Sequence, residues 1–153
     1  MGPPLSAGYG RTLLIDHSVW ARAGDGRLTG PPRKRFDTAL AAGDLWTCPA
    51  ALLEMRYSAR DGQQFAAIAQ ELDALEHAPL TSEAATAALT AQAELAKTPG
   101  ISHRVKPVDL LIAAIAAISK IGVLHYDHDY DTIAIHTPLT FPSVWVAPRG
   151  SMD

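Results

Sequence analysis

The sequence has little of what stabilises or exports an extracellular protein. It contains 153 residues and a single cysteine, Cys48, so an internal disulfide framework is excluded. A lone cysteine also fits a reducing compartment. The first residues, MGPPLSAGYGR, hold no apolar segment of signal-peptide length. We therefore expect a cytoplasmic protein.

Long hydrophobic runs and a strong net charge are also missing. The most apolar segment, Val108–Ile118, is shorter than the about 18 residues that indicate a membrane-spanning helix, so no membrane association is expected. Charged residues make up 19%, less than the roughly 25% of typical soluble domains, which favours a buried sheet with well-covered helices. The net charge of −3 gives no global attraction to nucleic acid. Such a partner would need a local basic patch or a bridging metal.

Short apolar segments alternate with segments of helical spacing along the chain. The predicted strands are 12–15, 45–47, 123–126 and 143–146, with a weaker edge strand at 76–80. The predicted helices are 33–42, 49–57, 63–75, 82–97 and 107–121. This alternation indicates a three-layer α/β/α fold around a parallel sheet. We expect one domain at 12–147, a flexible leader at 1–11 and a tail at 148–153.

Residues 106–131, KPVDLLIAAIAAISKIGVLHYDHDYD, join the most apolar predicted helix to a buried strand. Pro107 suits the first helical position, where its missing N–H is not needed, and Gly122 suits the helix stop. Asp109 lies in the first turn of this helix. Three further acids follow the strand: Asp127, Asp129 and Asp131. In open α/β sheets, that edge is where ligands bind.

Other acids are directed to the same edge. Asp16 follows the first predicted strand, and Glu54 lies one turn into the helix after the second. Carboxylates about 4 Å apart repel each other by about 4 kcal/mol at an effective dielectric of about 20, so protonation or bound cations must sustain such a cluster. Oxygen ligands select Mg²⁺ or Mn²⁺ over zinc. The pattern therefore indicates metal-assisted phosphodiester hydrolysis.

Each acid also has an ordinary structural explanation. Asp16 could cap a helix, and Asp109 could interact with the helix dipole. Glu54 could be a solvated helix residue, and residues 127–129 could form a polar turn. Their joint placement beside apolar neighbours favours a site, because burying a carboxylate is costly.

Four motifs carry a family resemblance. They are LLIDHSVW around Asp16, ALLEMRYSAR around Glu54, VDLLIAAIA around Asp109 and VLHYDHDYDTIA around Asp127. In this order and spacing they resemble a PIN-domain nuclease, and more narrowly a VapC toxin of a VapBC toxin–antitoxin pair. The resemblance covers about residues 12–146. It implies a parallel five-stranded sheet and a Mg²⁺- or Mn²⁺-dependent endoribonuclease acting as the toxin of a type II pair. It also implies a homodimer and a VapB-like antitoxin.

The resemblance also assigns roles to residues. It implies four catalytic and metal-ligating acids: Asp16, Glu54, Asp109 and Asp127. Asp129 is a further candidate ligand because it shares the D-x-D turn with Asp127. Ser18 matches a supporting hydroxyl that bonds a ligand carboxylate or a metal-bound water. One departure is His17, which stands where Thr is common.

The densest basic segment follows the first strand and indicates contact with the RNA backbone. Its candidate residues are Arg22, Arg33, Lys34 and Arg35. Two other functions are open. One is a non-catalytic PIN-like module that binds RNA or a partner. The other is an aspartyl-phosphate protein, but a phosphatase of that kind needs an acid where Ser18 stands, and a receiver domain needs paired acids where only Asp16 is present.

Overall fold

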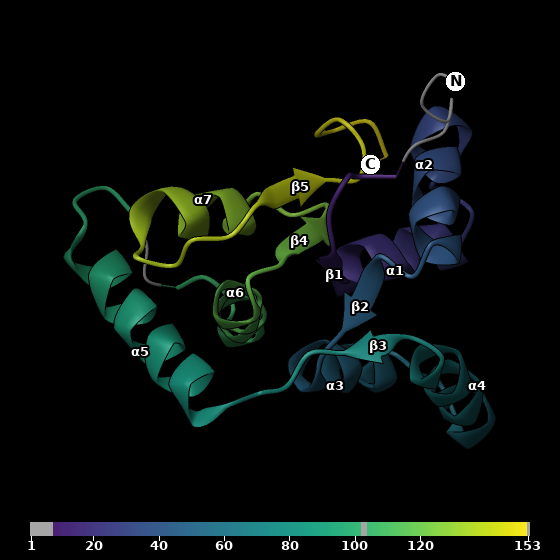
Figure 1. Cartoon of the computed structure of the whole chain (residues 1–153), viewed down its shortest axis with the longest axis horizontal. Helices are drawn as coiled ribbons and strands as arrows, with labels where there is room; N and C mark the ends of the chain where they lie inside the picture. Colours follow the sequence, from purple (N-terminus) through teal and green to yellow (C-terminus); the bar gives the residue numbers. More distant parts are fainter. Residues whose placement is uncertain (1–7, 102–103, 153) are drawn as a thin grey trace.

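The computed structural model describes residues 8–101 and 104–152. At its centre lies a five-stranded sheet with the order β3-β2-β1-β4-β5, and every neighbouring pair is parallel (Figure 1). The strands are β1 (Leu13–Ile15), β2 (Leu45–Thr47), β3 (Glu76–His77), β4 (Gly122–His125) and β5 (Ser143–Trp145). The predicted parallel five-stranded sheet is confirmed.

Helices cover both faces of this sheet. They are α1 (His17–Gly24), α2 (Gly30–Ala41), α3 (Pro49–Tyr57), α4 (Gly62–Asp73), α5 (Ser82–Lys97), α6 (Pro107–Ser119) and α7 (Asp129–His136). Figure 1 shows α5, α6 and α7 on one side of the sheet and α1 and α2 on the other. The predicted three-layer α/β/α fold is therefore confirmed. Across the described ranges, no helix is both long enough and apolar enough to cross a membrane.

The central strands and α6 form the core. Every residue of β1 is fully buried, as are Val123 and Leu124 of the neighbouring β4. Ile112 and Ile115 of α6 are equally buried. Parallel strands covered on both faces need continuous apolar runs, and this accounts for the runs in the sequence. The carboxyl ends of β1 and β4 consequently lie side by side at one edge of the sheet.

Three helices differ from the sequence prediction, and the first of them, α1, was not among the predicted helices. α2 begins at Gly30, three residues before the predicted start, because prolines in its first turn need no N–H partner. α7 was not predicted, and the possible polar turn at 127–129 overlaps it only at Asp129. Asp129 and Asp131 therefore lie in the first turn of a helix, where acids are favourable.

The predicted flexible leader is only partly described. Residues 1–7 lie outside the described residues. Tyr9 is 7% exposed and belongs to the core, and the guanidinium of Arg35 lies 4.3 Å from its ring centroid. Tyr9 thus buries its aromatic ring against α2, and the flexible leader at 1–11 stays a prediction.

Gly122 has a different role from the predicted helix stop. α6 ends at Ser119, and Lys120 adopts the left-handed conformation at its C-cap, with φ of 60°. Gly122 instead opens β4, between β1 and β5. A Cβ atom there would lie 2.6 Å from Leu13 Cδ2 and 2.8 Å from the Pro142 carbonyl oxygen. Only glycine allows the three strands to approach this closely.

We therefore expect Gly122→Ala to lower the free energy of unfolding by about 1–3 kcal/mol, the usual cost of overpacking. Gly62→Ala is the matched control, because a Cβ at Gly62 meets nothing within 4 Å. Its effect should be neutral, or stabilising by about 0.5–1 kcal/mol, because alanine favours the helix. Urea unfolding of both variants tests this, and equal stabilities would contradict the close packing of β4.

Candidate active site

Asp16 leaves β1 as the N-cap of α1 and is 2% exposed. Its Oδ2 atom accepts hydrogen bonds from the backbone N–H of Ser18 at 3.0 Å and from the Ser18 hydroxyl at 2.5 Å. Its Oδ1 atom accepts a hydrogen bond from the hydroxyl of Tyr130 at 2.6 Å. Asp16 therefore caps α1 and also remains a candidate site residue. Ser18 bonds the carboxylate directly, which is one of the two contacts expected of it.

Asp109 is fully buried in the first turn of α6. The Tyr130 hydroxyl lies 3.3 Å from its Oδ1 atom, whereas its Oδ2 atom has no hydrogen-bond partner. Burial raises the pKa of Asp109 to about 8, and repulsion from Asp16 adds to this effect. A buried carboxylate oxygen without a donor is costly unless a cation binds it.

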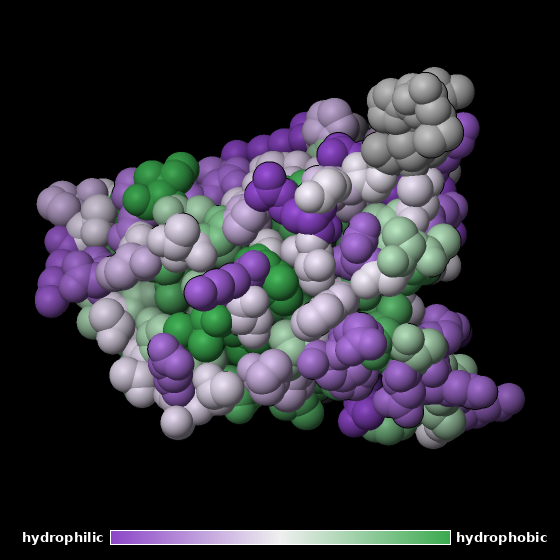
Figure 2. Space-filling view, in the orientation of Figure 1, coloured by the Kyte–Doolittle hydropathy of each residue, from purple (hydrophilic) through white to green (hydrophobic). Residues whose placement is uncertain are grey.

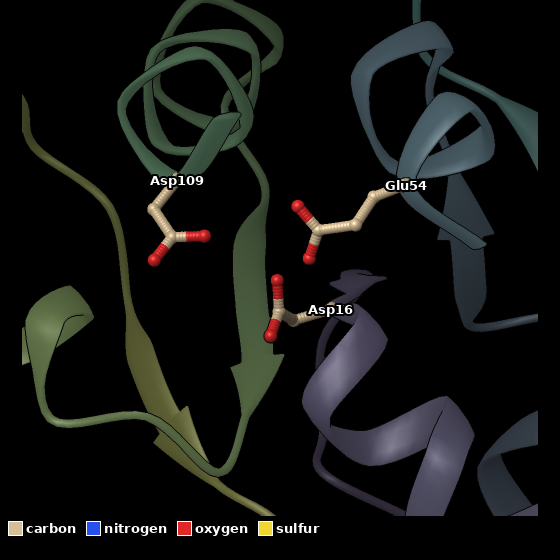
Figure 3. Close-up of side chains that lie close together, drawn as sticks. All are labelled: Asp16, Glu54 and Asp109. Atoms are coloured by element: carbon tan, nitrogen blue, oxygen red, sulfur yellow. The ribbon is translucent and has the colours of Figure 1, made fainter. Parts of the chain in front are cut away.

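Glu54 reaches the same place from α3 and is half-buried. Asp16, Glu54 and Asp109 each offer one oxygen, and these oxygens all lie within 4.8 Å of one another. Figure 3 shows the three carboxylates pointing toward a common centre from three different elements. Burial raises the pKa of Glu54, and repulsion from Asp16 raises it further. The donor set and the Asp109 oxygen without a hydrogen bond both fit a divalent cation.

Asp127 and Asp129 form a second group with Asp109, again with one oxygen from each within 4.8 Å of the others. The Oδ1 atom of Asp127 accepts the backbone N–H of Asp129 at 2.9 Å. Its Oδ2 atom lies 3.4 Å from the ammonium of Lys106. Burial raises the pKa of Asp129, followed by repulsion from Asp127. Asp109 thus belongs to both acidic groups, and the structure brings together all five predicted ligands.

Asp131 is directed away from this cluster. It accepts hydrogen bonds from the Ser143 hydroxyl at 2.7 Å and from the Trp145 indole at 2.8 Å. His125, fully buried beside it, has a pKa lowered to about 4 by burial and is neutral at pH 7. Its Nδ1 atom accepts the N–H of Asp127 at 3.2 Å. These bonds connect β5 to the turn that carries Asp127.

Two residues of the site were missed in the sequence. Tyr130 is fully buried and bridges Asp16 and Asp109, but its helix α7 was not predicted. Lys106 precedes α6 and lies near two of the acids. Its spacing of three residues before Asp109 is the one signal that could have indicated it, because that spacing brings side chains together at a helix start.

The predicted basic residues do not converge on the cluster. Three of the four make intramolecular contacts: Arg22, Arg33 and Arg35. Arg22, for example, lies over the Tyr126 ring at 4.5 Å. Lys34 is exposed on α2. Their contact with RNA stays a prediction.

A groove of about 630 Å³ opens between α1, α2 and α4. Its walls include His17, Trp20, Arg33, Phe36, Arg60 and Ile68. His17 directly follows Asp16, so the groove begins beside the acidic cluster. It combines aromatic rings with two guanidinium groups.

Comparison with known proteins agrees with this geometry. The PIN domain family matches residues 13–135. Ribonuclease VapC18 of Mycobacterium tuberculosis is 38% identical over 141 residues, which cover 92% of this chain and 98% of that protein. The chain belongs to the PIN-domain family, among the VapC ribonucleases. Ribonuclease VapC51 of the same organism is 34% identical over 141 residues, which cover 92% of this chain and 96% of VapC51. The family resemblance drawn from the four motifs is confirmed.

Solved structures show the same fold. DNA-bound VapBC from Salmonella typhimurium contains a chain that superposes on this PIN domain with a TM-score of 0.69 at 18% identity, covering 90% of this chain and 99% of that one. For VapBC2 from Rickettsia felis, bound to a promoter DNA fragment, the TM-score is 0.65 at 14% identity, with coverages of 86% and 98%. At such identities the likeness concerns the fold.

The raised pKa of Asp109 predicts how stability depends on pH without metal. The folded chain holds a proton on Asp109 up to about pH 8, whereas the ordinary pKa of the group is 3.8. This contribution to stability is complete below about pH 4 and is lost as pH rises to about 8. In EDTA, the free energy of unfolding should therefore fall between pH 5.5 and about 8 by more in the wild type than in Asp109→Asn. If chemical unfolding shows that the stabilities of the wild type and Asp109→Asn change equally with pH, the raised pKa of Asp109 is contradicted.

The Tyr130 hydroxyl orients two of the three carboxylates, so its removal should weaken cation binding. We expect Tyr130→Phe to raise the Kd for Mn²⁺ about 10-fold, because groups that orient ligands typically contribute that much or more to metal affinity. The ring itself, which stacks on His125 with centroids 4.9 Å apart, is kept. Isothermal titration of metal-free protein measures the affinity. Tyr57→Phe, at a side chain that is 89% exposed, is the control, and equal affinities in all three proteins would exclude the role.

Proposed function

We propose that this PIN domain is a Mg²⁺- or Mn²⁺-dependent endoribonuclease and the toxin of a type II toxin–antitoxin pair. The observation that carries the proposal is the convergence of Asp16, Glu54 and Asp109 within 4.8 Å, with a buried Asp109 oxygen that has no hydrogen-bond partner. The names of the relatives, ribonucleases VapC18 and VapC51, support RNA as the substrate.

The chain's own residues prepare the site for hydrolysis. A bound divalent ion supplies a Lewis acid that activates water and balances charge on the phosphate. Ser18 and Tyr130 hold the Asp16 carboxylate in one orientation beside Glu54 and Asp109. Glu54 is half-buried and offers the third oxygen that would hold this ion.

The groove beside the cluster suits a single-stranded nucleic acid. The half-buried Trp20 offers a ring on which a base can stack, and Arg33 and Arg60 offer positive charge to phosphates. Because the whole chain has a net charge of −3, such a local path is needed for RNA binding. We propose that the RNA backbone follows this groove toward Asp16, with Arg22, Lys34 and Arg35 as further candidate contacts.

We also propose a VapB-like antitoxin, a homodimer and a cytoplasmic location. The antitoxin is supported by the VapC relatives, and the single cysteine supports a reducing compartment. The homodimer is supported by an apolar hollow of about 300 Å³ between α5 and α6. Figure 2 shows hydrophobic surface over α6 beside α5, and Leu89 there is 69% exposed. A second copy of the chain would cover this surface.

An aspartyl-phosphate mechanism fits the site poorly. Both Asp16 oxygens accept hydrogen bonds from side chains of the domain, which reduces their strength as nucleophiles. No second acid stands at the Ser18 position to protonate a leaving group. Membership of the PIN-domain family also argues against an aspartyl-phosphate mechanism.

The decisive measurement is cleavage of a total-RNA pool by purified, antitoxin-free protein in EDTA, Mg²⁺ or Mn²⁺. We expect discrete products that require a divalent cation. Asp16→Asn should reduce cleavage about 100-fold or more, because loss of a metal ligand removes several kcal/mol of transition-state stabilisation. Asp73→Asn, an exposed acid at the end of α4, is the control and should cleave like the wild type.

Each outcome of that measurement has a distinct meaning. Folded protein that binds RNA but cleaves none with any cation would favour the non-catalytic module. Cleavage that persists undiminished in Asp16→Asn would place the active site elsewhere or reveal a contaminating nuclease. Mapping the product ends then identifies the cleavage sequence.

A further inference from the structure

A lysine lies across the second acidic group. The Nζ atom of Lys106 is 3.4 Å from Asp127 Oδ2 and 3.9 Å from Asp109 Oδ2. The side chain is 60% exposed, so the ammonium lies at the rim of the cluster, between buried acid and solvent. Lys106 immediately precedes Pro107 at the start of α6, and the backbone of that helix therefore determines where its Cα atom lies.

The two acidic groups differ in the cation that already lies against one of them. In each group both oxygens of one aspartate interact with donors of the chain: Asp16 with Ser18 and Tyr130, and Asp127 with the N–H of Asp129 and with Lys106. The groups share Asp109, whose Oδ2 atom has no hydrogen-bond partner. The ammonium of Lys106 lies nearer to Asp127 than to Asp109, so the group of Asp109, Asp127 and Asp129 already holds a positive charge.

We propose that Lys106 takes the place of a second divalent ion. In this arrangement a single ion is bound by Asp16, Glu54 and Asp109. The ammonium of Lys106 neutralises Asp127 and presents its exposed side to a phosphate of the RNA. A second divalent ion among Asp109, Asp127 and Asp129 would lie against this ammonium, and the two positive charges would repel each other. The inference rests on the proposed metal-dependent function.

The alternative is that Lys106 forms an ordinary surface ion pair. An exposed pair contributes little to stability and leaves metal binding unchanged. A lysine that occupies a cation position, in contrast, determines how many ions the cluster can hold. The number of ions bound per chain therefore distinguishes the two roles.

The experiment counts Mn²⁺ ions bound to the metal-free full chain, by isothermal titration and by the electron paramagnetic resonance signal of free Mn²⁺. We expect one ion per chain in the wild type and two in Lys106→Met, which keeps the length of the side chain but removes its charge. Lys106→Arg retains a positive charge and should bind one. The control is Lys97→Met, because Lys97 also pairs with an acid, Glu94 at 3.5 Å, but on the surface of α5. It should bind one ion.

Cleavage of RNA is the second readout. In Lys106→Met we expect kcat to fall roughly 100-fold, the usual effect of losing one preorganised charge at a reacting group, and Lys106→Arg should recover part of it. Two ions per wild-type chain would overturn the inference, as would one ion in both the wild type and Lys106→Met. If Lys106→Met fails to fold, Lys106→Gln serves for the same count.

Failure of this inference is separate from failure of the proposed function. The ion count requires no RNA, so it can be read even if no substrate is cleaved. A wild type that cleaves RNA with Mn²⁺ but binds two ions retains the function and loses the role of Lys106. If the wild type binds one ion, Lys106→Met binds two and no RNA is cleaved, the role of Lys106 is retained and the proposed function is lost.

Discussion

Repulsion among carboxylates at the carboxyl edge of the sheet is the constraint on which the rest of the site depends. Asp16, Glu54 and Asp109 come from three elements and meet within 4.8 Å. Carboxylates that close repel by about 4 kcal/mol per pair at an effective dielectric of about 20, so their proximity requires protons, donors or cations. The domain provides donors to Asp16 from Ser18 and Tyr130, and the Tyr130 hydroxyl also lies near Asp109. The Oδ2 atom of Asp109 has no hydrogen-bond partner, and this makes the cluster a candidate cation site.

The rigidity of the core keeps the acids in place. α6 buries Ile112 and Ile115 against the sheet, and the same helix carries Asp109 in its first turn. Gly122 allows β4 to lie close to its neighbours, which determines where the turn with Asp127 emerges. Side chains mounted on such elements are positioned more accurately than side chains on loops. The packing of α6 and β4 therefore both stabilises the core and positions Asp109 and Asp127.

The elements predicted correctly are those with a clear pattern of apolar residues in the sequence. Continuous apolar runs identified β1 and β4, because strands buried on both faces require them. α7 was missed because only two of its eight residues are buried, so no apolar periodicity marks it. Asp16 and Asp127 were found through their positions after strands, and Asp109 and Glu54 through their positions near the starts of helices. Tyr130 and Lys106 follow no such rule, and their roles depend on distances between remote segments.

Residue type and spacing along the chain were enough to predict the parallel α/β fold, the order of the acidic motifs and the family. Which carboxylate oxygens face one another depends on how distant segments pack. Tyr130 lies 114 residues after Asp16 in the chain, yet its hydroxyl bonds that carboxylate. The two acidic groups that share Asp109 likewise emerge only when β1, α3, α6 and α7 are packed together. Electrostatic energy depends on distances through space, which local pattern does not specify.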